Sequence, residues 1–182
     1  LEGGKSKCSQ YWPESCGVTE EKSNLLRSVD VTLDDERRAE HVITRSMTVK
    51  PDGDSDSWSF KQLHFLSWAD HAVPPIAELY DFLKNYAYLR KQKPLSNDFG
   101  PTVVHCSAGV GRTGTLICAQ VLLDQLRTNP QTIDIFGTVL ALRVFRKRLV
   151  QVKVSLKLSS PREFGTIMGP DLLRADEFSL AL

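Results

Sequence analysis

The sequence predicts an α/β domain in which helices flank a twisted, mixed β-sheet. Three observations predict this class. Alternating apolar and polar residues, typical of strands, occur in the first half of the chain, and apolar residues at helical spacing occur in the second half. Between two such segments lies a glycine-rich run at residues 106–114, which is expected to form an anion-binding loop between a strand and a helix.

Strands with alternating apolar and polar residues are predicted in the first half of the chain at residues 28–33, 41–49 and 58–66. The first two are joined across the charged residues 34–38. The segment 50–57 is rich in turn-forming residues, and its alternating aspartates are similar to those of a calcium-binding loop. The twelfth position of such a loop is Leu63 instead of the required glutamate, so we expect a solvated hairpin loop.

Apolar residues at helical spacing predict helices in the second half of the chain at residues 76–90, 113–127 and about 130–148. Prolines stand at the start of the first and last of these helices, where proline is favoured. Residues 92–100 are predicted to be a linker that leads into a short buried strand at residues 101–104. Residues 152–158 alternate again and predict a further strand.

The glycine-rich run places Cys106 and Arg112 six positions apart, so that a thiolate and a guanidinium can converge on one phosphate. Gly109 and Gly111 let the backbone curl without the penalty of a Cβ atom. The amides of the curl and of the first helical turn can then face inward and bind an anion. The residues predicted to bind the phosphate are Ser107, Ala108, Gly109, Val110, Gly111 and Arg112.

The same environment is expected to activate the cysteine. A free cysteine is only about 3% thiolate at pH 7. Cys106 lies at the positive end of a predicted helix, among amide donors and beside Arg112, all of which favour the thiolate. The Thr113 hydroxyl can donate to the sulfur and help it to leave in a second step, and His105 is expected to support the loop from behind. We therefore predict that Cys106 is a nucleophile.

Two other interpretations of this run are less favoured. A cysteine in an apolar context is commonly a small buried side chain, but that interpretation does not explain the spacing of Cys106, the glycines and Arg112. A nucleotide-binding P-loop requires a Gly-Lys-Ser/Thr step, and the run contains no lysine.

Residues 105–113 resemble the signature His-Cys-x5-Arg-Ser/Thr of the cysteine-dependent protein tyrosine phosphatases. Residues 7–13 (KCSQYWP) resemble a segment of the classical, phosphotyrosine-specific branch of that family, and residues 64–74 (HFLSWADHAVP) resemble its mobile Trp-Pro-Asp loop. The resemblance covers residues 1–151 and implies a partial catalytic domain with the tyrosine phosphatase fold. Residues 152–182 are expected to form a divergent C-terminal tail.

The resemblance implies roles for residues outside the glycine-rich run. Asp70 would protonate the leaving tyrosine oxygen and then take a proton from water. Gln151 would position that water, and Glu2 would brace Arg112. The family's proline between Trp and Asp is Ala69 here, which lacks a fixed φ and adds an amide N–H. As a hypothesis, this change makes the closed loop less favoured and turnover slower.

The function implied by the resemblance is hydrolysis of phosphotyrosine in proteins through a phosphocysteine intermediate, with no metal and no cofactor. Phosphotyrosine-containing proteins are the expected partners. Two alternatives stay open: a catalytically impaired fragment that binds phosphotyrosine or regulates a phosphatase, and a dual-specificity phosphatase that also accepts phosphoserine and phosphothreonine. Residues 7–13 favour the phosphotyrosine-specific branch over the second alternative.

Composition limits the other partners. The formal net charge of +1 gives no overall attraction to nucleic acid or to anionic membranes. The basic run at residues 143–148 is interpreted as a solvated helix end in preference to a nucleic-acid patch. No apolar run approaches the roughly 18 residues that a membrane span needs, so we expect no membrane insertion of this segment.

The cysteines and histidines indicate a reducing compartment. The cysteines form no Cys-x-x-Cys pair, and the histidines do not cluster with them at metal-ligand spacing. The cysteines in question are Cys8, Cys16, Cys106 and Cys118. We therefore expect no metal site and a cytoplasmic location, with the intracellular region of a transmembrane receptor as the alternative.

Overall fold

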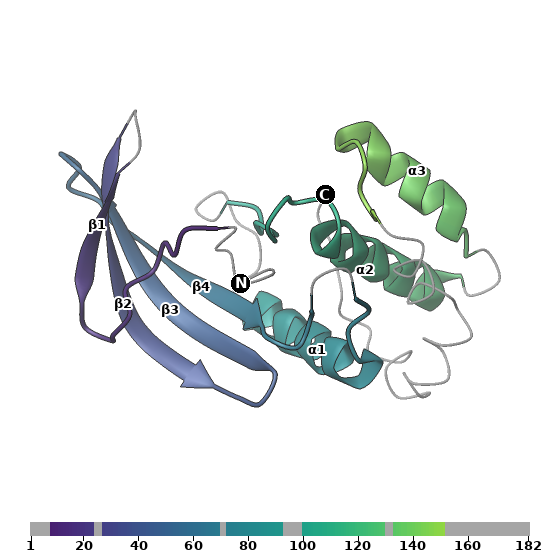
Figure 1. Ribbon diagram of the computed structural model, residues 1–182, viewed down its shortest axis with the longest axis horizontal. Helices are drawn as coiled ribbons and strands as arrows, with labels where there is room; N and C mark the ends of the chain where they lie inside the picture. The colour runs from purple at the N-terminus through teal and green to yellow at the C-terminus, as the bar shows by residue number, and fades with distance from the viewer. Residues whose placement is uncertain (1–7, 24–26, 70–71, 93–99, 130–132, 152–182) are drawn as a thin grey trace. The chain divides into compact units, whose positions relative to one another are not determined.

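The computed structural model describes residues 8–23, 27–69, 72–92, 100–129 and 133–151. The chain divides into two compact units, Leu1–Ser67 and Trp68–Leu182. The described residues of the first unit form a four-stranded sheet, and those of the second form three helices (Figure 1). The chain thus combines sheet and helices as the sequence predicts.

The sheet of the first unit is antiparallel throughout, with each strand hydrogen-bonded to the next one along the chain. Its strands, in order, are β1 (Thr19–Ser23), β2 (Ser28–Arg38), β3 (Val42–Pro51) and β4 (Trp58–Phe65). Three of these strands confirm the predicted ones. Strand β1 was not predicted, because its sequence TEEKS lacks an apolar alternation, and it forms through backbone pairing with β2.

Strand β2 is longer than the sequence predicts. The charged segment 34–38, expected to connect two strands, continues β2 and pairs with β3 as far as Arg38 opposite Ile43. The register shifts between Leu33 and Asp35, which is where the apolar alternation of β2 stops. The turn itself follows, and the Ala39 N–H donates to the Val42 carbonyl oxygen at 2.9 Å.

One face of this sheet carries the core of the first unit. Val31, Leu33 and Met47 are at most 5% exposed, and they lie at alternating positions of β2 and in register on β3. Tyr11 and Trp12 pack against them from the segment that precedes β1. The period-two pattern of the sequence therefore places one apolar face inward, as expected for a strand buried on one side.

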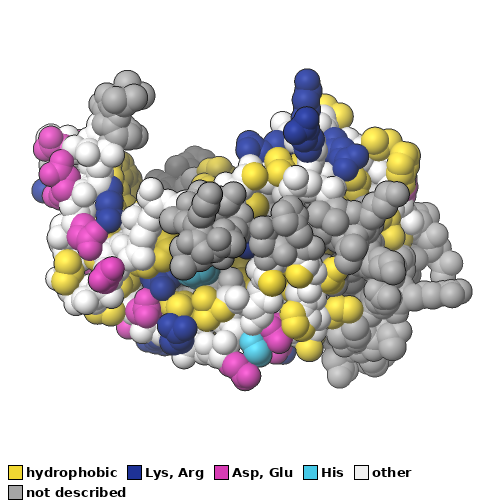
Figure 2. Space-filling model, in the orientation of Figure 1, with side chains coloured by type: hydrophobic (Ala, Val, Ile, Leu, Met, Phe, Trp, Pro, Cys, Tyr) yellow, Lys and Arg dark blue, Asp and Glu magenta, His cyan; other side chains and the backbone are white. Residues whose placement is uncertain are grey.

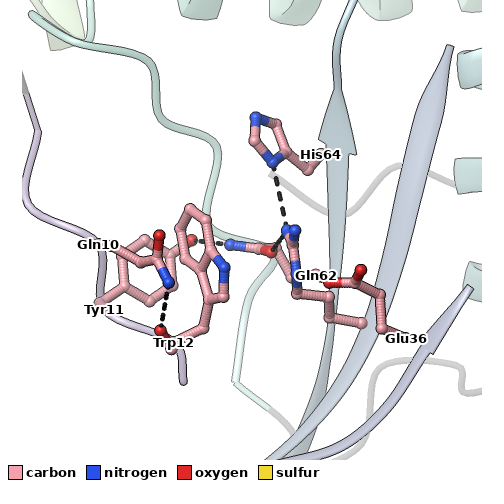
Figure 3. Close-up of polar contacts among 7 residues, drawn as sticks. Gln10, Tyr11, Trp12, Glu36, Gln62 and His64 are labelled. Atoms are coloured by element: carbon pink, nitrogen blue, oxygen red, sulfur yellow. Dashed lines mark hydrogen bonds and ion pairs between the residues drawn. The ribbon is translucent and has the colours of Figure 1, made fainter. Parts of the chain in front are cut away.

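A buried arginine organises polar side chains on the same sheet (Figure 3). The Arg45 Nε donates to Glu36 Oε2 at 2.6 Å and its Nη1 donates to Gln62 Oε1 at 2.8 Å. Both partners lie directly opposite Arg45 on the neighbouring strands. The guanidinium also lies over the Trp12 ring, 4.6 Å from its centre. Because a guanidinium only donates, the 3.2 Å contact with His64 Nδ1 makes that nitrogen an acceptor.

The second unit contains α1 (Ile76–Gln92), α2 (Arg112–Thr128) and α3 (Ile135–Phe145). Helices α2 and α3 pack together (Figure 1). The buried residues of their shared core are Cys118, Leu122, Val139, Leu142, Leu149 and Val150. In the described parts of the chain, no helix is both long enough and apolar enough to cross a membrane.

Two predicted elements of the second unit are wrong. Residues 101–104 do not form a strand, and Val103 is 82% exposed. No described strand pairs with this segment, and an isolated strand leaves its backbone N–H and C=O groups without partners. The four strands that the structure describes pair antiparallel. The last helix begins at Ile135 and not near residue 130, because the Asp134 carboxylate accepts from the Gly137 N–H at 2.8 Å and caps it.

Replacing the buried arginine should destabilise the sheet. We expect Arg45→Met to lower the free energy of unfolding by about 1–3 kcal/mol, because it removes the buried cation that donates to the partly exposed Glu36 carboxylate and to the Gln62 amide oxygen. Urea unfolding followed by circular dichroism measures this change.

Arg37→Met is the matched control, since Arg37 pairs with Asp35 on the same strand at 3.0 Å but is 84% exposed. We expect this control to change the free energy of unfolding by about 0.5 kcal/mol or less. Equal losses in the two variants would contradict the importance of the buried cluster.

Candidate active site

The glycine-rich run forms a loop that leads directly into α2. Residues 106–111 are loop, and the helix begins at Arg112. Gly111 is the N-cap, and no side chain from the described residues caps this end of the helix. The first turn of α2 also contains no acidic residue. The positive end of the helix is therefore open to an anion held by the loop.

Cys106 lies half-buried at the start of this loop. Burial raises the pKa of the Cys106 thiol, but the donors around the sulfur more than offset this, so the pKa is lowered overall. These donors are the Thr113 hydroxyl and the backbone N–H groups of Thr113, Gly109 and Val110. The loop thus stabilises negative charge where a thiolate would form.

The Thr113 hydroxyl is buried, and its oxygen has no partner at normal hydrogen-bond distance and angle among the residues that the structure describes. It nevertheless lowers the pKa of Cys106 as a nearby donor does. Sulfur is a large and weak acceptor, so we interpret the contact as a long one that stabilises the thiolate. The role of Thr113 in the second step stays a prediction.

Three backbone carbonyls of the loop accept hydrogen bonds from residues outside the loop. The Ala108 oxygen accepts from Arg146 Nη2 at 3.2 Å, and the Val110 oxygen accepts from the Val150 N–H at 3.0 Å. The Gly111 oxygen accepts from the N–H and the hydroxyl of Thr115, each at 3.0 Å. With its carbonyls held on the outside, the loop can turn N–H groups toward its centre.

Gln151 lies against the same loop. A Cβ atom at position 111 would be 3.3 Å from Gln151 Oε1, so the glutamine side chain packs on Gly111. The structure therefore brings together Cys106, the amides of the loop and Gln151, although 45 residues separate Gln151 from Cys106 in the sequence. The role of Gln151 toward water stays a prediction.

The segment that presents Gln151 is held in an unusual conformation. Arg148 and Val150 have positive φ values of 66° and 57°, which are uncommon for residues other than glycine and rare for a β-branched one. Arg143, on the last turn of α3, donates from Nε to the Leu149 oxygen at 2.9 Å and from Nη2 to the Val150 oxygen at 3.1 Å. Arg143 therefore clamps the segment from the helix side.

Arg112 is linked to the segment that contains the predicted acid. Its Nη1 lies 3.4 Å from the Trp68 carbonyl oxygen. The Trp68 indole N–H donates to the Ala72 oxygen at 3.0 Å, and the Ala72 N–H donates to the Ala69 oxygen at 3.3 Å. These bonds connect Arg112, Trp68, Ala69 and Ala72, the described residues on either side of positions 70 and 71.

Two of the predicted site residues, Asp70 and Glu2, lie outside the described residues. His105 is exposed, and its Nδ1 lies 3.3 Å from the Cys106 carbonyl oxygen, so its contact is with the backbone at the start of the loop. The catalytic roles of all three residues stay predictions. The tail at residues 152–182, with its predicted strand, also lies outside the described residues.

Sequence reasoning missed two arginines of this site. The basic run at residues 143–148 is predicted to be a solvated helix end. Arg143 instead donates to backbone carbonyls of the segment that leads to Gln151, and Arg146 donates to the Ala108 carbonyl of the glycine-rich loop. Figure 2 shows a group of Lys and Arg side chains on this part of the surface. A signal was present in the sequence, because the two arginines are three positions apart at a helix end and close to Gln151.

The contact between α2 and the Gln151 segment predicts the effect of a small substitution. Gly114 lies in α2, where alanine is normally favoured over glycine by about 1 kcal/mol. A Cβ atom at position 114 would lie 2.5 Å from the Val150 nitrogen and 2.9 Å from Leu149 Cδ2. We therefore expect Gly114→Ala to lower the free energy of unfolding by about 1–3 kcal/mol, because the backbone of the packed segment must move.

Thermal and urea unfolding measure this loss. Gly100→Ala is the control, since no atom of the described residues other than its chain neighbours lies within 4 Å of a Cβ atom at position 100. The control should change the free energy of unfolding by about 0.5 kcal/mol or less. An increase in stability for Gly114→Ala would show that the segment does not pack on α2 in this way.

Comparison with known proteins identifies the family. Residues 1–159 match the family model for protein-tyrosine phosphatase. The chain is 37% identical to human receptor-type tyrosine-protein phosphatase eta and to Caenorhabditis elegans tyrosine-protein phosphatase Lar-like, and 36% identical to human tyrosine-protein phosphatase non-receptor type 20. Each match covers 84% of this chain but only 11%, 6% and 34% of the respective relative. The chain, in which Cys106 and Arg112 stand at the two ends of one glycine-rich loop, belongs to the protein-tyrosine phosphatase family.

Proposed function

We propose that this chain hydrolyses phosphotyrosine in proteins by a two-step mechanism with Cys106 as nucleophile. The observation that carries the proposal is the set of donors around Cys106, which lowers the pKa of its thiol despite partial burial. A lowered pKa supplies the thiolate, which is the nucleophilic form, at neutral pH. Membership of the family supports the same reaction.

In the first step the Cys106 thiolate attacks phosphorus. The S–P bond forms while the bond between phosphorus and the tyrosine oxygen breaks, and Asp70 gives its proton to that oxygen. In the second step the Asp70 carboxylate takes a proton from a water that Gln151 positions, and the water oxygen attacks phosphorus. The P–S bond breaks, inorganic phosphate leaves, and the thiolate is restored with help from the Thr113 hydroxyl.

Arg112 and the loop amides stabilise the phosphoryl group in both steps. A guanidinium can hold two equatorial oxygens in a planar fork, and amides that already point inward need no reorganisation when charge moves onto those oxygens. The 3.4 Å contact between Arg112 and the Trp68 carbonyl supports a coupling between this arginine and the segment of sequence that includes Asp70. Arg112 would then help to align the acid with the phosphate, and Glu2 would brace Arg112 as the resemblance implies.

Partners and location are part of the same proposal. Phosphotyrosine-containing proteins are the substrates, and neither nucleic acid nor insertion into a membrane is required. A cytoplasmic location keeps Cys106 reduced, and its support is that the four cysteines of the chain form no disulfide. Receptor-type and non-receptor-type phosphatases are both among the relatives, so the intracellular region of a receptor stays an alternative. Residues 1–151 would form the catalytic part and residues 152–182 the tail.

The first test is release of phosphate from phosphotyrosyl and phosphoseryl peptides by the 182-residue chain and by two variants. We expect Cys106→Ser to lower kcat by at least about 10³-fold, because no other group replaces the nucleophile. Cys16→Ser, at an exposed cysteine, should leave kcat unchanged.

Circular dichroism must show that all three proteins are folded. A folded parent that binds the phosphotyrosyl peptide without turnover would replace the proposal with a binding or regulatory role. Comparable release from the phosphoseryl peptide would assign a dual-specificity activity instead.

The alanine in the acid loop leads to a separate prediction. Ala69→Pro restores a fixed φ and removes an N–H, which should favour one loop conformation by about 0.4–1 kcal/mol and raise kcat about two- to fivefold. The control is Ala72→Pro, which removes the N–H that donates to the Ala69 oxygen and should not raise kcat. The pH–rate profiles of the three proteins measure these effects, and identical profiles for the parent and Ala69→Pro would reject the hypothesis.

A further inference from the structure

Arg146 is an exposed residue that ends α3 and yet reaches the catalytic loop. It is the C-cap residue of the helix, and its backbone N–H donates to the Leu142 oxygen. Its side chain crosses to the loop, where Nη2 donates to the Ala108 oxygen at 3.2 Å. The guanidinium also lies over Gly109, since a Cβ atom at position 109 would be only 3.2 Å from Nη2.

The hydrogen bond from Arg146 to the Ala108 oxygen also fixes the direction of the Gly109 N–H, because both groups belong to one planar peptide unit. The described residues contain no cis peptide bonds, so the carbonyl of Ala108 and the N–H of Gly109 point in opposite directions within one plane. Gly109 N–H is one of the donors to the Cys106 sulfur. A donor that holds the Ala108 oxygen on the outside therefore also aims the Gly109 N–H at the sulfur.

We propose that Arg146 is a positioning residue, whose guanidinium holds the Ala108 carbonyl outside the loop and so keeps the Gly109 N–H directed at Cys106 Sγ. The effect of Arg146 on catalysis rests on the proposed function. Its effect on the direction of one amide donor to the thiolate involves only Arg146, Cys106 and the loop.

The Ala108 peptide is the part of the loop where a side chain matters most. Among the described residues, the Val110 and Gly111 oxygens accept from the backbone N–H groups of Val150 and Thr115, which no substitution except proline removes. The Ala108 oxygen accepts from a side chain instead. Gly109 itself has φ of +68°, a conformation that glycine adopts without strain, so its peptide is free to rotate unless a neighbour holds it.

A charged hydrogen bond is suited to this task. A guanidinium donates more strongly than a neutral group, and it polarises the peptide it binds, which makes the opposite N–H a better donor. Arg146 also brings a positive charge near the thiolate, and that charge alone would favour the anion. The test must therefore separate orientation of the peptide from the general effect of charge.

Lys147 provides the matched control. It is the next residue, it is exposed, and its side chain makes no hydrogen bond or ion pair with the described part of the chain. Arg146→Met and Lys147→Met each remove one positive charge from the same segment. Arg146→Gln removes the charge but keeps an NH₂ donor, and it serves as the second variant.

The experiment measures the rate at which iodoacetamide alkylates Cys106 between pH 4 and pH 9, with peptide mapping to identify the modified cysteine. We expect Arg146→Met to raise the pKa of Cys106 by about 0.5–1 unit, because one of its amide donors loses its fixed direction. Arg146→Gln should raise the pKa less, and Lys147→Met by no more than about 0.2 unit, because an exposed charge is screened by solvent and salt. Circular dichroism of each variant verifies folding.

Equal pKa values for Arg146→Met and Lys147→Met would overturn the proposal, because charge alone would then explain the effect. The same pKa in Arg146→Met and the parent would overturn it as well. Since alkylation needs no substrate, these outcomes do not depend on turnover. A parent that fails to hydrolyse phosphotyrosine, but whose Cys106 pKa responds to Arg146→Met as expected, would contradict the proposed function and leave this inference standing.

Discussion

The candidate site depends on the close packing of the segment 149–151 against the glycine-rich loop at residues 106–111 and the start of α2. The Val150 N–H donates to the Val110 oxygen at 3.0 Å, and Val150 approaches α2 so closely that position 114 has no room for a side chain. This approach places Gln151 beside Gly111. Residues far apart in the sequence thereby share one anion site, because α3 returns the chain to the start of α2.

This packing requires a strained backbone, and the surroundings offset the strain. Positive φ values at Arg148 and Val150 cost on the order of 1–3 kcal/mol each. Leu149 and Val150 are only 4% and 2% exposed, and burial of such side chains contributes about 1.5–3 kcal/mol each. The two hydrogen bonds from Arg143 to their carbonyls then select the strained conformation over alternatives with the same burial.

Local patterns predicted the loop that leads into α2, but they could not predict contacts between residues far apart in the sequence. The spacing of Cys106 and Arg112 is local, so the loop and the start of α2 could be predicted, as could the hairpins with their period-two alternation. The strand at residues 101–104 was predicted only from the apolar residues of that segment, but a strand forms only where another strand pairs with it. The hydrogen bonds of Arg143 and Arg146 depend on which segments lie beside the end of α3. The sequence of a basic run at a helix end is the same whether its side chains are solvated or bind backbone carbonyls.

The hydrogen bonds that surround the loop suggest how nucleophilicity depends on helix packing. The Val110 and Ala108 carbonyls of the loop accept hydrogen bonds from Val150 and Arg146, and both of these donors follow the last turn of α3. Any displacement of α3 relative to α2 would weaken both hydrogen bonds together, and the Gly109 N–H that faces Cys106 would lose the contact that holds its peptide. The pKa of Cys106 is therefore a property of the α2 and α3 core as much as of the loop, so a substitution buried in that core can weaken the nucleophile without touching it.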